Sequence, residues 1–230
     1  MTEKRSTKTI IGLIIAGVLA IIVALGALGF FQFYQTADNL YKQGNVFGEV
    51  PMKDGAYTAV KITGYAKNPI ATIDGGTKLY LIEFSKTDTD DFGYASIEVK
   101  DGDKLIDKLN AADDLVENPV IVAAKIRKSG ADGAVRNYTI EFKDTISENE
   151  TISKLAETEY YASVYEFDKD RQFSYIIAGI AGIIALVFFY SAFATRKSED
   201  KAYNELYSAY PELNYSMDSV LEDATYVDNQ

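Results

Sequence analysis

Carboxylates are the residues of this chain with the most evident capacity for chemistry. The segment 88–93 reads Asp-Thr-Asp-Asp-Phe-Gly, and carboxylates at alternate positions before a glycine are typical of the opening of a calcium loop. The pattern then departs from such a loop, because Phe92 stands at a ligand position and Val99 where the closing glutamate belongs. Carboxylate pairs for glycoside hydrolysis could be assembled from these residues, but nothing in the sequence fixes the separation that this chemistry needs. We therefore expect a solvated loop, with no metal, cofactor or catalytic residues.

The absence of two residue types narrows the chemistry further. The chain contains 0 cysteines and 0 histidines, which excludes Ser-His and Cys-His catalysis, disulfides and the usual zinc sites. Its net charge is −11, whereas nucleic acids and anionic lipid head groups both attract clustered Lys and Arg. We therefore expect neither nucleic acids nor anionic lipid head groups as partners. We also expect no enzymatic activity, and a carboxylate-dependent enzyme is the weakest of the alternatives.

Aromatic side chains in the polar middle of the chain are the remaining candidates for a binding surface. Such rings could stack on a sugar or on a protein partner, although aromatic residues in strands more often pack into a core. The candidate binding face consists of Tyr57, Tyr65, Tyr80, Phe92 and Tyr94.

Two long uncharged runs bracket this middle segment. Thr9 to Phe31 and Gln172 to Thr195 are each longer than the ~20 residues with which a helix crosses the hydrocarbon core. A cleaved signal peptide is the alternative for the first run, but an apolar signal core is normally only ~7–15 residues. We therefore predict two transmembrane helices in the plasma membrane.

The cations beside these runs predict the orientation. Three precede the first run and three follow the second, whereas only Lys42, Lys169 and Arg171 lie on the inner flanks. The excess of Lys and Arg marks the cytoplasmic side. Both termini are therefore expected in the cytoplasm, with the middle segment outside it. The outer cations are Lys4, Arg5, Lys8, Arg196, Lys197 and Lys201.

Small residues recur every four positions in both runs. Such strips let helices approach closely in lipid. They favour packing of the two helices on each other as a hairpin, and self-association between copies is the alternative. The strips are Gly12, Ala16, Ala20 and Ala24 in the first run, and Ser174, Ala178 and Gly182 in the second.

The middle segment predicts a small barrel. Runs of β-forming residues are separated by Asp-Gly, Asn-Pro and Gly-Gly turn signals and by one short helical pattern at 103–110. Three strands, a helix and two strands are the element order of the five-stranded OB barrel, and an open sheet covered by a helix is the alternative. The predicted strands are 57–65, 70–73 with 78–84 as one hairpin, 94–99, 119–126 and 134–142.

Helical stalks are predicted where the chain leaves the membrane. No helix breaker follows the first run until Gly44, and Ser147 with Glu150 has the S-x-x-E pattern of a capping box. After the second run, apolar residues at spacings of three and four predict an amphipathic cytoplasmic helix. These tail residues are Tyr203, Leu206, Tyr207, Tyr210 and Leu213.

The expected organisation combines these elements. It consists of a cytoplasmic tail at 1–8, a transmembrane helix at 9–33, a stalk helix at 34–46, an OB-like ectodomain at 47–144, a second stalk helix at 147–171, a transmembrane helix at 172–195 and an acidic, Tyr-rich cytoplasmic tail at 196–230.

This span, barrel, span layout resembles uncharacterised two-pass membrane proteins of Gram-positive bacteria that carry an OB-like extracytoplasmic domain. The resemblance lies in architecture and transfers no functional residues. It implies a non-catalytic protein of the cell envelope whose barrel docks a membrane-protein partner or a second copy. A barrel that binds a cell-wall saccharide through exposed tyrosines is the alternative.

Overall fold

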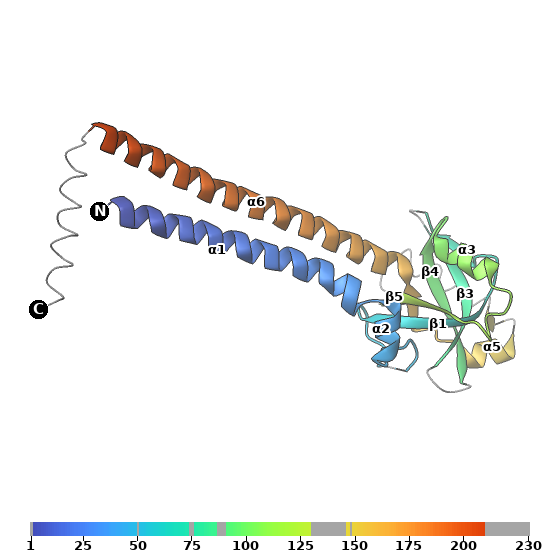
Figure 1. Cartoon of the computed structure of the whole chain (residues 1–230). Helices are drawn as coiled ribbons and strands as arrows, with labels where there is room; N and C mark the ends of the chain where they lie inside the picture. The colour runs from blue at the N-terminus through green and yellow to red at the C-terminus, as the bar shows by residue number, and fades with distance from the viewer. Residues whose placement is uncertain are drawn as a thin grey trace, which may run out of the picture. The chain divides into compact units, whose positions relative to one another are not determined.

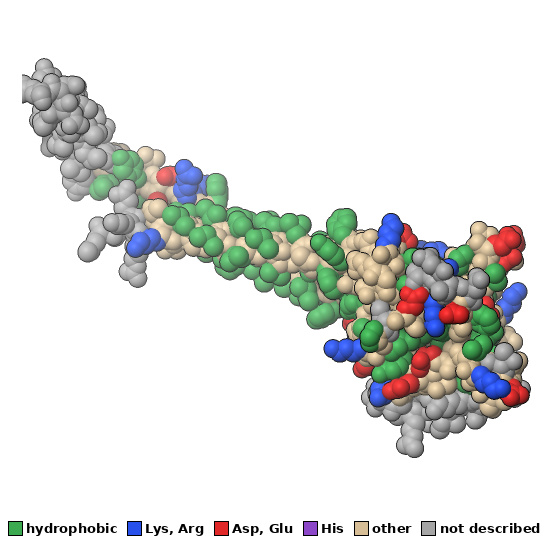
Figure 2. All heavy atoms as spheres, turned by 90° about the horizontal axis from the view of Figure 1, so that it is seen from below, with side chains coloured by type: hydrophobic (Ala, Val, Ile, Leu, Met, Phe, Trp, Pro, Cys, Tyr) green, Lys and Arg blue, Asp and Glu red, His purple; other side chains and the backbone are tan. Residues whose placement is uncertain are grey.

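The computed structural model describes residues 2–49, 51–73, 76–86, 91–129, 146–147 and 149–209. It contains two compact units, one of Met1–Leu25 with Ile177–Gln230 and one of Gly26–Ile176. Within the described residues, two helices are long and apolar enough to cross a membrane, in agreement with the two uncharged runs. They are α1 (Thr2–Gly29) and α6 (Val164–Ala209). Figure 2 shows apolar side chains over most of the long helices and mixed charges over the barrel.

The middle of the chain forms a closed five-stranded barrel with one helix, which confirms the predicted fold class (Figure 1). β1 pairs with both β3 and β5, and β6 lies between β4 and β5, so the sheet closes on itself. The β4–β6 pairing is parallel, and a short strand β2 (Ala71–Ile73) extends the edge of β3. The barrel elements are β1 (Tyr57–Tyr65), β3 (Thr77–Ser85), β4 (Phe92–Lys100), α3 (Lys104–Ala111), β5 (Val120–Lys128) and β6 (Tyr160–Ser163).

The barrel interior is filled by every second residue of its strands, because successive side chains point to opposite faces. Ile62, Ile82 and Ile97 are all fully buried, and α3 contributes Leu105 and Leu109 to the same core. β3 is buried on both faces at its start, as predicted. Its outward-facing Leu79 packs with Ala71 and Tyr161.

The predicted second stalk helix at 147–171 is wrong. This region holds a short helix α5 (Glu150–Leu155), then the barrel strand β6, and α6 begins only at Val164. Insertion between β4 and β5 buries Tyr161 and Ala162, so tertiary pairing overrides the local helical pattern. The predicted strand at 134–142 lies outside the described residues.

The capping residues of these helices also differ from the prediction. The Ser163 hydroxyl accepts a hydrogen bond from the Glu166 amide at 3.0 Å, so the S-x-x-E pattern at 163–166 marks the start of α6. α5 is capped instead by Asn149, whose side-chain oxygen accepts from the Ile152 amide at 3.2 Å.

The predicted first stalk at 34–46 is not one helix. α1 passes into a π-helical turn η1 (Phe30–Tyr34), and a separate helix α2 (Ala37–Lys42) follows a bend. Thr36 starts α2 because its extended backbone turns the chain and its hydroxyl accepts from the Asn39 amide at 3.3 Å. Gly44 follows α2 with φ +73°, in the left-handed conformation expected just past a helix end.

The small-residue strips are only partly buried. Gly12 is exposed, and a Cβ at Gly12 or Gly182 would meet nothing within 4 Å, whereas one at Gly17 would lie 3.0 Å from Phe189. Steps of four residues drift ~40° around a helix with 3.6 residues per turn, so a strict four-residue strip leaves the contact face. Of the strip residues in α1, Ala16, Ala20 and Ala24 are half-buried, and of those in α6, Ser174 and Ala178 are buried and Gly182 is half-buried.

The first part of the predicted cytoplasmic tail helix is helical. α6 continues through Tyr203 and Leu206 to Ala209, and both side chains are more than half exposed at 56% and 51%. Tyr210, Leu213 and the side chain of Tyr207 lie outside the described residues, as do Asp88, Thr89 and Asp90 of the acidic segment.

Candidate functional site

An aromatic cluster holds the end of the first apolar run and the start of α6 against the barrel. Phe31 of η1, Tyr57 of β1 and Phe167 of α6 meet edge to face, with ring centroids 5.5 to 5.7 Å apart. Phe30 joins this cluster at 5.2 Å from Phe31. Aromatic pairs in this geometry add to the stability that burial provides. All four rings belong to the unit Gly26–Ile176.

Polar contacts fix the first turns of α6 to the barrel wall. Asp170 pairs with Lys125 at 2.7 Å and accepts from the Tyr57 hydroxyl at 2.9 Å. Glu166, one turn earlier, pairs with Arg127 at 3.3 Å. Residues 125 and 127 share one face of β5, and residues 166 and 170 share one face of α6. The two cations of the strand can therefore face the two carboxylates of the helix. Burial and the neighbouring Asp170 raise the pKa of Tyr57, which therefore stays a neutral donor.

A buried carboxyl group links the start of α6 to β4. Glu98 of β4 is only 7% exposed and accepts a 2.6 Å hydrogen bond from the Ser163 hydroxyl, the same group that caps α6. A side-chain hydrogen bond from Thr77 also reaches it. Burial raises the pKa of Glu98, although these hydrogen bonds and Arg127 oppose the shift.

We expect acidification to stabilise the fold through Glu98. Its pKa is higher in the folded chain than in the unfolded chain, so its stabilising contribution is complete below the unfolded pKa and is lost as pH rises through the folded pKa. Glu98→Gln keeps an acceptor for Ser163 and removes the charge. Its melting temperature should therefore rise relative to the wild type as pH increases from about 4 to about 8. A difference in melting temperature between the two proteins that stays constant from about pH 4 to about pH 8 would contradict this role of Glu98.

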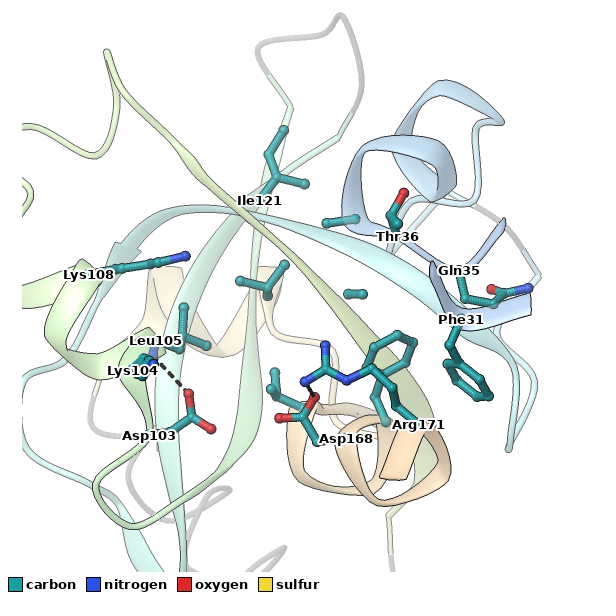
Figure 3. A pocket seen from close by; sticks show the side chains of 15 residues that line it. Phe31, Gln35, Thr36, Asp103, Lys104, Leu105, Lys108, Ile121, Asp168 and Arg171 are labelled. Atoms are coloured by element: carbon teal, nitrogen blue, oxygen red, sulfur yellow. Dashed lines mark hydrogen bonds and ion pairs between the residues drawn. The ribbon is translucent and has the colours of Figure 1, made fainter. Parts of the chain in front are cut away.

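A groove opens beside the aromatic cluster (Figure 3). Its cavity volume is 340 Å³, at the lower end of the ~300–1,000 Å³ typical of ligand pockets. The base is apolar, with Phe31, Leu105, Val122, Val164 and Phe167, and Gln35 and Thr36 line one side.

Charged side chains form the rim of this groove. Asp103 accepts from the Leu105 amide at 2.8 Å, and Asp168 pairs with Arg171 at 2.8 Å. Lys104 and Lys108 are exposed, and no ion pair to either is present among the described residues. With Arg171, the rim therefore carries three cations and two carboxylates, a net charge of +1. The sequence gives no signal for this groove, because its lining comes from four separate parts of the chain.

The predicted aromatic face is not a single surface. Tyr57 lies in the aromatic cluster, while Tyr65 and Tyr80 pack against the barrel core with ring centroids 6.5 Å apart. Only Phe92 and Tyr94 form an outward pair, 6.0 Å apart. Tyr57 and Tyr65 have the same parity in β1, but the register shift between Ile62 and Gly64 turns Tyr65 to the core face.

Phe92 belongs to an exposed apolar surface, the distal patch, formed by Phe92, Tyr94 and Leu155. Phe92 is 44% exposed and Leu155 43% exposed. The Glu157 amide donates to the Tyr94 carbonyl at 2.7 Å, which holds the end of α5 beside β4. Lys100, at the other end of β4, lines a small cavity with Tyr165 and Asp168. The distal patch therefore lies a full strand length, about 26 Å, from the start of α6.

Comparison of the chain with protein-family models, with curated proteins and with solved structures found no match.

Proposed function

We propose that this chain is a non-catalytic two-pass membrane protein whose OB-like barrel is a docking module for a membrane-protein partner or a second copy. Both termini lie in the cytoplasm, and the barrel lies on the extracytoplasmic side of a bacterial envelope. The distal patch is the observation that supports docking best. It exposes two large apolar side chains, Phe92 and Leu155, at the end of β4 opposite α6.

Attachment of the barrel to both apolar segments adds support. The aromatic cluster and the Asp170 and Glu166 ion pairs restrain the barrel at two points of the chain, Phe31 and the first turns of α6. A module held in this way loses little additional freedom when a partner binds, which favours affinity.

The saccharide alternative has less support. Sugar recognition combines an aromatic ring with free polar groups, and the hydroxyls of Tyr57, Tyr65 and Tyr94 already donate to Asp170, Asn110 and Glu83. The exposed ring of Phe92 has no polar group of its own, so it suits contact with an apolar protein surface better than contact with a glycan.

Site-specific photo-crosslinking in intact cells tests the docking function. A benzoylphenylalanine residue at Phe92 or Leu155 should give the same discrete adduct, and the adduct mass separates a partner from a second copy. The matched position is Glu117, which is exposed on the barrel outside the patch. Identical adducts at Glu117, or none at the patch, would contradict docking there.

Cysteine labelling tests the topology without background, because the natural chain has 0 cysteines. With an impermeant thiol reagent, Glu117→Cys should react in intact cells and Thr2→Cys only after lysis. Labelling of Thr2→Cys in intact cells would contradict a cytoplasmic N-terminus.

A further inference from the structure

The groove of Figure 3 lies next to both apolar runs along the chain. Phe31 of its lining closes the first run, and Arg171 immediately precedes the second. At ~1.5 Å rise per residue in a helix, Arg171 is within one turn of the apolar part of α6. If both runs are spans, the groove is at the level of lipid head groups.

The groove has an apolar base and a charged rim, as an amphiphilic ligand has an apolar and a charged part. The base offers apolar side chains from η1, α3, β5 and α6, including Leu105, Val122 and Phe167. The rim offers the ammonium groups of Lys104 and Lys108 with the Arg171 guanidinium. Of the two rim carboxylates, Asp103 is engaged by the Leu105 amide and Asp168 by Arg171.

We propose that this groove binds one anionic phospholipid, with the phosphate between Lys104, Lys108 and Arg171 and the first methylene groups against Ile121 and Val122. The inference rests on the proposed membrane placement. It also changes the expectation that so acidic a chain avoids anionic lipids. The net charge of −11 belongs to the whole chain, whereas this rim contains more cations than carboxylates. Juxtamembrane Lys and Arg near the bilayer surface attract anionic lipids strongly enough to select them.

The apolar base distinguishes a lipid from a soluble anion. A free phosphate would use only the rim and would leave the half-buried Ile121 and Val122 in contact with water. A phospholipid covers these side chains and reaches the cations at the same time.

Lipid retention by the purified full-length protein tests the proposal. The protein in mild detergent is titrated with phosphatidylglycerol or phosphatidylcholine, and bound lipids are counted by native mass spectrometry. We expect one retained phosphatidylglycerol, bound at least about tenfold more tightly than phosphatidylcholine. Lys104→Gln with Lys108→Gln should abolish this preference. Ala123→Trp, which fills the groove from β5, should weaken binding of both lipids.

The matched control replaces two exposed barrel lysines outside the groove, Lys53→Gln with Lys67→Gln, and should bind as the wild type does. Equal retention of both lipids by the wild type, equal loss in the control, or competition by glycerol 3-phosphate at lipid concentrations would overturn the proposal. A melting curve for each variant separates lost binding from lost folding. If the protein needs detergent but shows no preference for phosphatidylglycerol, only the lipid site is contradicted. If the protein stays soluble without detergent, the proposed membrane function is contradicted.

Discussion

Phe167→Ala should lower the free energy of unfolding of the barrel by about 3–5 kcal/mol, the usual loss for a large aromatic residue removed from a packed site. Phe167 is only 3% exposed and contacts the rings of Phe31 and Tyr57 at centroid distances of 5.7 and 5.5 Å. Its removal leaves a cavity between η1, β1 and α6. Chemical denaturation in detergent, followed by tyrosine fluorescence, measures the loss.

Phe173→Ala is the control for this prediction. Phe173 lies on the same helix but is 62% exposed, so it has few packing partners to lose. We expect a change of less than about 1 kcal/mol from such an exposed position. Equal effects of the two substitutions would mean that the aromatic cluster does not hold α6 against the barrel.

Gly48→Ala should destabilise the barrel by about 2–5 kcal/mol, from a left-handed backbone and an overpacked core together. Gly48 has φ +88°, and a Cβ there would lie 2.6 Å from Cε2 of Phe84. The ring has little room to move, because it is buried against Phe47 at a centroid distance of 5.2 Å. Its other edge lies close to Gly93, where an added Cβ would be only 2.8 Å from the ring.

Gly55→Ala separates the two causes. Gly55 has a similar φ of +84° but nothing within 4 Å of its Cβ position, so only the backbone term of about 1–2 kcal/mol applies. The difference between the two variants, measured by the same denaturation, reports the clash with Phe84. Equal destabilisation by the two substitutions would show that the residues around Phe84 move to accommodate the added Cβ.

The barrel strands with strong local signals could be predicted from the sequence. β1 has the predicted bounds, Tyr57–Tyr65, because β-forming residues run there without interruption between two turn signals. The helical pattern at 103–110 likewise matches α3, whose start depends on Asp103, because the Asp103 side chain caps the helix.

The elements that depend on distant partners could not be predicted in this way. β6 has four residues, and pairing with β4 and β5 makes it a strand. Ser147 and Ser163 both open an S-x-x-E pattern, and only the burial of Ser163 beside Glu98 distinguishes them. The groove has no sequence signal either, since η1, α3, β5 and α6 meet there only in the folded chain.

The central claim is that α6 grows directly out of a barrel strand, so the barrel and the start of this helix move as one body. Amide hydrogen exchange of the full chain in nanodiscs tests it most directly. The pairing of β6 with β4 and β5 predicts that the amides of Tyr161, Ala162 and Ser163 exchange as slowly as those around Ile97 of β4. The Glu166 amide, which donates to the Ser163 hydroxyl, should be protected together with them. If these amides exchange as fast as those of Val116 and Glu117 in the exposed loop, the claim is contradicted. The connection between the barrel and α6 would then be flexible.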